Sequence, residues 1–296
     1  MACCRYEVTL NSVTMASLDS AIIIHDVCYD APKYERNIFR VANLNGARTG
    51  RTYKERCSVT ILFEIHEYSI SARQGVITKI INWAKNGGDL RINDRPNQKL
   101  ICVCDKLPSI DSALDWLSEL SITFTAYEIP YWISVTDLTT SGRYSGASTT
   151  TKSDTYKFFE LEVPGDAPFV LPKSIIASGF QNTASVTDAV YFELTNSSIS
   201  SDFMCATAGL PANTSGTFEY SYNDKNIMTF QMRYGTTISH LFGRYTDASK
   251  IHELLLKGGA TNNVGISVTK RVAGSPSNTY SPLSCDVAIT WRGYWE

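Results

Sequence analysis

The stretch from residue 36 to residue 92 constrains the fold most, because it joins an arginine-rich segment, an alternating run and one helical pattern. Between Ser58 and Glu64, Val59, Ile61 and Phe63 fall on one face, and the other face is mostly polar. Alternation with a period of two is typical of a half-buried strand. We therefore expect a strand here, with the arginine-rich segment before it and a helix after it.

The helical pattern lies between Ser71 and Gly88. Its apolar residues recur at intervals of one, three and four, which makes a single stripe: Val76, Ile77, Ile80, Ile81 and Ala84. Ser71 is the predicted N-cap, and Gly87 with Gly88 supplies the positive φ that ends a helix. Trp83 lies off the centre of the stripe. This pattern predicts one amphipathic helix that covers a sheet.

The segment before the strand is strongly basic. It carries one acid, Glu55, and six basic residues: Arg36, Arg40, Arg48, Arg51, Lys54 and Arg56. So many like charges in a polar stretch do not form a core, so we expect an extended arm that lies against the surface of a partner.

The second half of the chain alternates in short runs separated by turn residues. The predicted strands are Lys157–Val163, Ser174–Gly179, Ala189–Leu194, Asp202–Ala206, Thr217–Tyr222, Ile227–Tyr234, Ile238–Tyr245, Val264–Thr269 and Val287–Trp291. This spacing is typical of an antiparallel sandwich. A helix is suggested only at Ala248–Lys257, and Leu107–Leu120 reads equally as a short helix or as a loop with a strand.

A change of composition near Asp137 predicts two domains. Residues 136–155 contain almost no apolar side chains and many Ser, Thr and Gly, which is typical of a linker or long loop. We expect a β-rich domain with one helix at residues 1–136. A β-sandwich is expected at 137–296, with 137–155 as the connection, so the fold class is mainly β.

Composition excludes several classes of protein. The formal net charge is −2, which argues against a general nucleic-acid binder. The 8 cysteines include no CxxC pair, so we expect reduced, structural thiols and no metal site, as in a protein assembled in a cytoplasm. No apolar run approaches the ~20 residues of a membrane span, and no signal peptide is recognisable.

The sequence offers no complete catalytic motif. His252-Glu253 and His66-Glu67 each begin like a zinc-protease helix, but the second histidine four residues on is missing. GxSxG, GxxxxGK[ST] and GxGxxG are absent. We expect no enzyme activity and no cofactor.

Several motifs follow one another in a distinctive order. The first half contains ERNIFRVANLNGARTG, YKERCSVTILFEI, NWAKNGGDLRINDRP and SITFTAYEIPYW. The second half contains FEYSYNDKNIMTFQMRYG, HELLLKGGATNNVGISV and VAITWRGYWE. In this order the motifs resemble the distal tail proteins of long-tailed, non-contractile (siphovirus-type) bacteriophages, a phage tail component family. The long Ser/Thr/Gly connection departs from the pattern, and the terminal Trp291–Trp295 segment either finishes the sandwich or returns to the first domain.

The resemblance implies a structural protein of a phage or prophage tail tip, made in the bacterial cytoplasm. The first domain would form a hexameric ring, single or doubled into a dodecamer, and the arm would reach a neighbour. The second would be a galectin-like sandwich. The implied partners are the tail tube protein, a tail-tip hub or fibre protein, and a receptor-binding protein or cell-wall carbohydrate. No membrane and no specific nucleic acid are implied.

Two surfaces carry alternative interpretations. The arm residues Arg36, Arg40, Arg48, Arg51 and Arg56 either tether a neighbouring subunit or touch a passing genome, and we favour the tether because a channel that gripped phosphates would stall passage. One hairpin gathers Tyr220, Tyr222, Asn223, Asp224, Arg233 and Tyr234. These form either a carbohydrate or partner surface or, as we favour, cross-strand pairs of the sheet.

Overall fold

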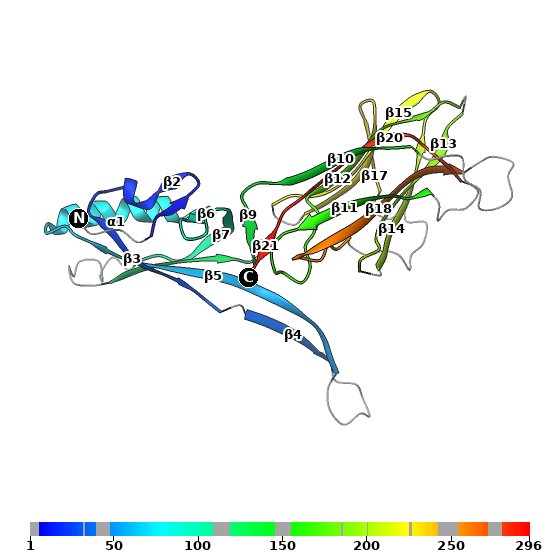
Figure 1. The fold of residues 1–296 in the computed structure, drawn as a ribbon. Coiled ribbons are helices and arrows are strands. Elements are labelled where there is room, and N and C mark those ends of the chain that lie inside the picture. The colour runs from blue at the N-terminus through cyan, green and yellow to red at the C-terminus, as the bar shows by residue number, and fades with distance from the viewer. Residues whose placement is uncertain are drawn as a thin grey trace. The chain divides into compact units, whose positions relative to one another are not determined.

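The computed structural model describes residues 6–31, 33–39, 48–108, 119–145, 155–184, 186–199, 201–224, 227–241, 254–271 and 280–296, without the side chains of 36–39, 48–53, 201–205 and 271. The chain divides into two compact units, which Figure 1 shows. Unit 1 is Met1–Val135 with Trp295–Glu296, and unit 2 is Thr136–Tyr294. The terminal segment therefore does both things that the sequence left open, since residues 291–294 belong to unit 2 and Trp295–Glu296 return to unit 1.

Unit 1 is a sheet covered by a helix. Its elements are β1 (Val8–Leu10), β2 (Val13–Thr14), the 3₁₀-helix η1 (Met15–Ser17), β3 (Ile22–Tyr29), β4 (Lys33–Phe39), β5 (Arg48–Ile65), α1 (Ile70–Ala84), β6 (Gly88–Ile92), β7 (Gln98–Lys106), β8 (Leu120–Ala126) and β9 (Trp132–Ser134). The main strand order is β2-β1-β6-β7-β8-β5-β3, with β4 beside β5 and with β9 pairing with β7 and with the terminal strand β21 (Tyr294–Trp295). α1 lies along one face of this sheet (Figure 1).

The predicted strand is the central part of the much longer β5. Val59, Ile61 and Phe63 are fully buried, as the alternation predicts. This part pairs with β3 on one side and β8 on the other, whereas the part from Arg48 to Arg56 pairs with β4 alone. The described parts of the basic segment, residues 36–39 and 48–56, therefore lie in a two-stranded ribbon that projects from the sheet (Figure 1).

α1 buries the predicted stripe. Val76, Ile77, Ile80 and Ala84 join the core of unit 1, while Ile81 and Trp83 pack at its margin. The predicted N-cap was wrong by two residues. Ser69 is extended, at φ −82° and ψ 126°, and its hydroxyl accepts a hydrogen bond from the Ala72 amide, because the apolar residue Ile70 already begins the helix.

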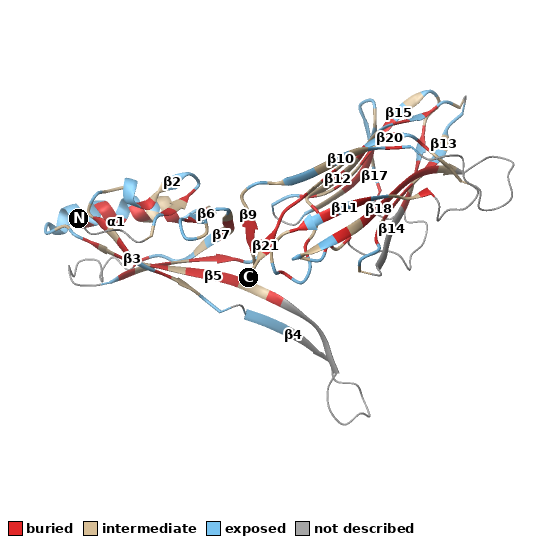
Figure 2. Cartoon of the chain, in the orientation of Figure 1, coloured by how far each residue is buried: buried red, intermediate tan, exposed pale blue. Residues whose placement is uncertain are grey.

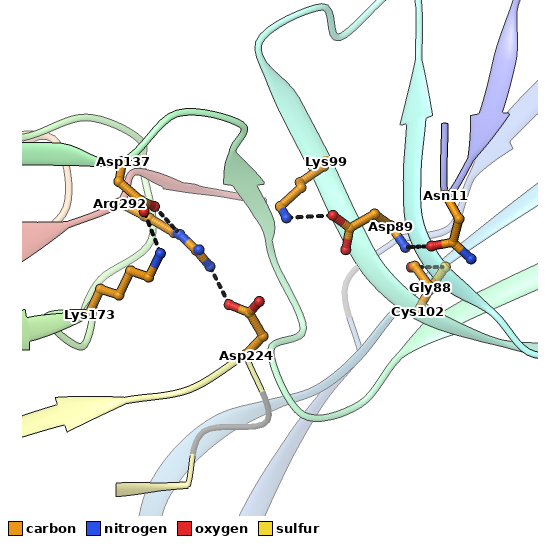
Figure 3. Close-up of polar contacts among 9 residues, drawn as sticks. All are labelled: Asn11, Gly88, Asp89, Lys99, Cys102, Asp137, Lys173, Asp224 and Arg292. Atoms are coloured by element: carbon orange, nitrogen blue, oxygen red, sulfur yellow. Dashed lines mark hydrogen bonds and ion pairs between the residues drawn. The ribbon is translucent and has the colours of Figure 1, made fainter. Parts of the chain in front are cut away.

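The glycine pair after α1 closes the helix as predicted. Gly87 has a φ of 61° and Gly88 a φ of 133°. A Cβ on Gly87 would meet the Cys102 carbonyl oxygen at 2.2 Å. The Asn11 side-chain amide donates to the Gly87 carbonyl oxygen at 2.9 Å. It also accepts from the Asp89 backbone amide at 3.0 Å (Figure 3). The turn thus ties α1 to β1 and β7.

Unit 2 is an antiparallel sandwich. Its strands are β10 (Leu138–Tyr144), β11 (Lys157–Val163), β12 (Ser174–Asn182), β13 (Asp188–Asn196), β14 (Ser201–Leu210), β15 (Thr214–Tyr222), β16 (Met228–Tyr234), β17 (Thr237–His240), β18 (Ala260–Arg271), β19 (Tyr280–Pro282) and β20 (Cys285–Trp291). Within the described ranges, six strands form the sheet β10-β20-β12-β15-β16-β17, and five form β11-β18-β13-β14 with β19 beside β18. The prediction of a mainly β chain with one helix and antiparallel sheets is confirmed.

Stacked aromatic rings join the two sheets of unit 2. The Phe218 ring lies 4.9 Å from that of Phe180 on its own sheet and 4.7 Å from that of Phe192 on the other, nearly parallel to both. All three side chains are fully buried, and Figure 2 shows the buried residues running along the strands of both layers. The alternation read from the sequence therefore corresponds to the inner faces of a sandwich.

The prediction of a linker or long loop at residues 137–155 was wrong for its first part. Residues 138–144 form β10, which pairs with β20 from Leu138↔Trp291 to Tyr144↔Cys285. Its polar composition reflects its place at the edge of the sheet, where most side chains remain exposed. Residues 146–154 lie outside the described ranges, as do most of the ambiguous 107–120 segment and the start of the suggested helix at 248–257.

The described cysteines are free thiols: Cys28, Cys57, Cys102, Cys104 and Cys285. Burial raises the pKa of the Cys102 and Cys285 thiols to about 12, so both stay protonated and unreactive near neutral pH.

Two glycine substitutions should have opposite effects on stability. Gly75 is an exposed residue of α1 with open space around its missing Cβ, so Gly75→Ala should raise the free energy of unfolding by roughly 0.5–1 kcal/mol. Gly87→Ala should lower it by more than about 1 kcal/mol, because of the positive φ and the close Cys102 carbonyl. Urea denaturation of both variants checks this, and a stabilising Gly87→Ala would contradict the described turn.

Candidate interaction surfaces

The predicted basic arm divides into a base that packs on the sheet and a ribbon beyond it. At the base, Lys54 is buried with its Nζ 4.4 Å from the centre of the Tyr131 ring. Glu55 forms an ion pair with Lys33 at 2.6 Å, and Arg56 is half-buried. Lys54 and Arg56 therefore belong to the packing of the sheet.

The remaining arginines lie farther out along the ribbon. Arg36 is on β4, and Arg48 and Arg51 are on β5; their side chains and the whole of Arg40 lie outside the described part of the chain. The register pairs Arg36 with Thr52 and Phe39 with Arg48. β4 and β5 thus bring arginines that are distant in sequence onto one hairpin, and the role of this hairpin as a tether stays a prediction.

The second predicted surface, at the β15–β16 hairpin, contains two core residues. Tyr220 is fully buried, Tyr222 nearly so, and their hydroxyls lie 3.1 Å apart. The Tyr220 hydroxyl also accepts the Leu254 amide at 3.1 Å. Sugars stack on exposed aromatic faces, and these two rings offer none, so packing is the interpretation that burial supports for them.

The polar members of this hairpin have structural partners. The Asn223 side chain accepts the Ile227 amide at 2.9 Å and closes the turn. Arg233 pairs with Glu219 at 3.1 Å, and Tyr234 is partly exposed beside it. Asn223, Asp224 and Arg233 are exposed, so a partner surface at this hairpin stays a prediction that rests on these residues.

Asp224 belongs to a charged cluster that the sequence did not indicate. The Arg292 guanidinium donates from Nε to Asp137 at 2.5 Å and from Nη1 to Asp224 at 2.6 Å (Figure 3). Lys173 pairs with the second Asp137 oxygen. Arg292 is 9% exposed, and a guanidinium so far buried needs such partners to offset its lost hydration. Sequence pattern gives no signal for this cluster, because its members are far apart along the chain.

The cluster fixes both ends of unit 2. Asp137 precedes β10, where the chain begins this unit, and Arg292 follows β20, where it leaves. β10 and β20 are neighbours in the sheet. The ion pair between Arg292 and Asp137 therefore joins the start of β10 to the end of β20. The first and last segments of unit 2 are thereby joined, although they are far apart along the chain.

A cavity lies close to this base, also within unit 2. Its volume is about 680 Å³, and its apolar lining comes from Leu138, Val163, Pro164 and Trp291, with Thr139, Glu162 and Thr261 as polar members. The Trp291 indole N–H donates to the Glu162 carbonyl oxygen at 2.9 Å. The volume is within the ~300–1,000 Å³ range of ligand sites.

Two of the three described histidines contact the same glutamate. His25 and His66 both contact Glu64, at 3.1 and 3.0 Å, and His240 lies on β17, whereas His252 is outside the described ranges. Among the residues with described positions, no group of three His, Cys, Asp or Glu side chains is arranged to hold a metal ion. No helix in those ranges is long and apolar enough to cross a membrane.

Acid should weaken unit 2 through Asp137. Burial alone would raise the pKa of Asp137, but hydrogen bonds from Arg292 and Lys173 outweigh it and hold that pKa below its usual value. The stabilisation is therefore complete above the pKa of the unfolded chain and is lost as pH falls through the lowered folded pKa. Asp137→Asn should flatten the fall in melting temperature between about pH 5 and about pH 2.

Asp286→Asn is the matched control for this experiment, because Asp286 is 71% exposed and its nearest cation, Arg143, is 3.8 Å away. Calorimetric scans across this pH range compare the three proteins. A wild-type slope retained in Asp137→Asn would contradict the role of the cluster.

Comparison with known proteins finds a similar structure but no similar sequence. No family model matches the chain, and no curated protein matches it in sequence. The structure is similar to the crystal structure of Dit (gp 19.1) of phage SPP1, described as a paradigm of the hub adsorption apparatus in phages that infect Gram-positive bacteria. The TM-score is 0.57 at 9% identity, over 97% of this chain and 98% of that chain.

Two structures of the phage P2 baseplate in its activated conformation, one with calcium and one with strontium, also match. Their TM-scores are 0.37 and 0.35 at 10% identity, over 96% of this chain and 97% of each matched chain. These scores are too low to show a shared fold, so the structural likeness rests on SPP1 Dit alone. At 9% identity that likeness shows a shared fold along nearly the whole chain.

Proposed function

We propose that this protein is a structural component of a phage or prophage tail tip, a hexameric hub that joins the tail tube to the tip or baseplate. The observation that carries the proposal is the fold shared with SPP1 Dit over 97% of this chain. Agreement over this length includes both units, and Dit is described as part of a hub adsorption apparatus.

Each of the two units would have its own role in the hub. Unit 1 would form the ring, singly or as two rings back to back, with its β4–β5 ribbon reaching a neighbouring subunit. Heterologous contacts of this kind close into rings when the rotation between subunits allows it. Unit 2 would act as a galectin-like docking arm for a receptor-binding protein or a cell-wall carbohydrate. Six modest contacts on one ring would act together at high effective concentration.

A structural role suits the chemistry of the described surfaces. The charged groups of unit 2 are paired at its base, and the buried thiols are held protonated. The activity of such a hub would consist of assembly and docking. Formation of the ring is the first part of this activity that can be measured.

The oligomeric mass tests the proposal. Size exclusion with light scattering should give six or twelve times the 32.8 kDa of the chain, because a ring is the state in which a hub works. A monomer at every concentration tested would overturn the hub, and a glycan array on the same sample would then test unit 2 as a carbohydrate-binding module.

Charge reversal in the ribbon tests the tether. Arg48→Glu with Arg51→Glu should shift the ring toward monomer, because like charges would replace attraction at the contact. Arg91→Glu with Lys106→Glu makes the same charge change on exposed residues of unit 1 outside the ribbon, and this variant should keep the ring. A ring unaffected by the Arg48 and Arg51 changes would contradict the tether.

A further inference from the structure

The cavity of unit 2 lies where two sheet edges are open. β10 ends the six-stranded sheet and pairs only with β20, and β11 ends the five-stranded sheet and pairs only with β18, within the described strands. Leu138 of β10 and Glu162 and Val163 of β11 all line the cavity. An open edge of this kind can accept an extended segment from another chain. The term edge groove is used below for this cavity and the adjoining β11 residues Glu160 and Glu162.

Trp291 gives the edge groove a fixed apolar wall. It is 6% exposed, lies on β20, and reaches the β11 carbonyl of Glu162 at 2.9 Å. Because this hydrogen bond holds the indole between the two sheets, the wall is formed before any ligand arrives. Leu138, Val163 and Pro164 add apolar surface around it.

The charge of the edge groove is negative and uncompensated. Glu160 and Glu162 are exposed, and no ion pair or hydrogen bond to either carboxylate occurs among the described residues. None of the cavity's lining residues is basic. Of the cations near these residues in the sequence, Lys157 on β11 contacts the Arg143 carbonyl oxygen and the Phe159 ring. Arg292, which follows Trp291, is held by Asp137 and Asp224.

This combination suits a guanidinium group. A guanidinium is planar and weakly hydrated, so it can lie against apolar and aromatic surface while its N–H groups contact a carboxylate. An anionic ligand would meet Glu160 and Glu162 without a compensating cation. The ligand class is therefore an arginine side chain carried on an extended segment.

We propose that the edge groove of one subunit receives arginine side chains from the basic ribbon of a second copy of this chain; this rests on the proposed ring. The chain supplies the complement itself, since the stretch from Arg36 to Arg56 carries six basic residues against one acid. Arg36, Arg48 and Arg51 lie on the paired strands β4 and β5, which hold such side chains on an extended support. The tether thereby gains a specific receptor on unit 2.

A charge exchange tests the pairing in the full-length protein. Glu160→Arg with Glu162→Arg should raise the concentration at which half of the rings dissociate by roughly tenfold or more, as Arg48→Glu with Arg51→Glu should. Joining all four changes should restore assembly toward the wild-type concentration, because the charges are complementary again. Asp286→Arg, at an exposed site outside the edge groove, is the control and should leave assembly unchanged.

A second measurement does not depend on the ring. A labelled peptide of residues 36–56, RNIFRVANLNGARTGRTYKER, is titrated into the full-length Arg48→Glu, Arg51→Glu variant and followed by fluorescence anisotropy. Binding should weaken roughly tenfold or more when Glu160→Arg and Glu162→Arg are added, and it should weaken with salt. A scrambled peptide is the sequence control, and circular dichroism confirms that each variant is folded.

The outcomes separate the two proposals. Rings that survive the glutamate reversals but not the arginine reversals would place the tether elsewhere and overturn the edge groove, while the hub would stand. A wild-type protein that is always monomeric would overturn the hub, and peptide binding that depends on Glu160 and Glu162 would still support the edge groove. A peptide that never binds would overturn the second copy as its occupant.

Discussion

The ion pairs of Arg292 are the constraint on which the organisation of unit 2 depends. The chain leaves unit 1 before Asp137, builds a whole sandwich, and returns to unit 1 at Trp295. Such an insertion is compact only if its first and last strands are neighbours, and β10 and β20 are paired along their length. Arg292 holds Asp137 and Asp224 at the base of that pair, and removal of one member would leave an uncompensated, largely buried charge.

The same arrangement gives the proposed function its physical basis. The ribbon of unit 1 ends in a segment with excess positive charge, and the edge groove of unit 2 carries glutamates without partners among the described residues. The two surfaces are suited to each other, because an open strand edge can accept another strand and opposite charges attract. In the proposed ring both surfaces would be covered on every subunit, so one sequence would specify both the arm and its receptor.

The β15–β16 hairpin shows where sequence reasoning is weakest. Tyr220, Tyr222 and Asp224 are clustered in sequence, but two of them face the core and the third pairs with Arg292. Aromatic residues are frequent in strands for reasons of packing, so their density cannot distinguish a binding face from an inner face. By contrast, Glu160 and Glu162 lie in an ordinary alternating run, and the sequence does not indicate that this run, β11, becomes the edge of its sheet.

The sequence by itself determined the elements with strong local periodicity. The stripe of α1, the buried row Val59, Ile61 and Phe63, the glycine stop at Gly87 and the runs of β11 and β20 all follow from spacing, because periods of 3.6 and 2 are fixed by backbone geometry. Only the tertiary structure decided that residues 138–144 are an edge strand, that Arg292 meets Asp137 and Asp224, and that Glu162 lines a cavity with Trp291. These features depend on contacts between distant segments, and local pattern carries no record of which strand becomes an edge or which charges meet.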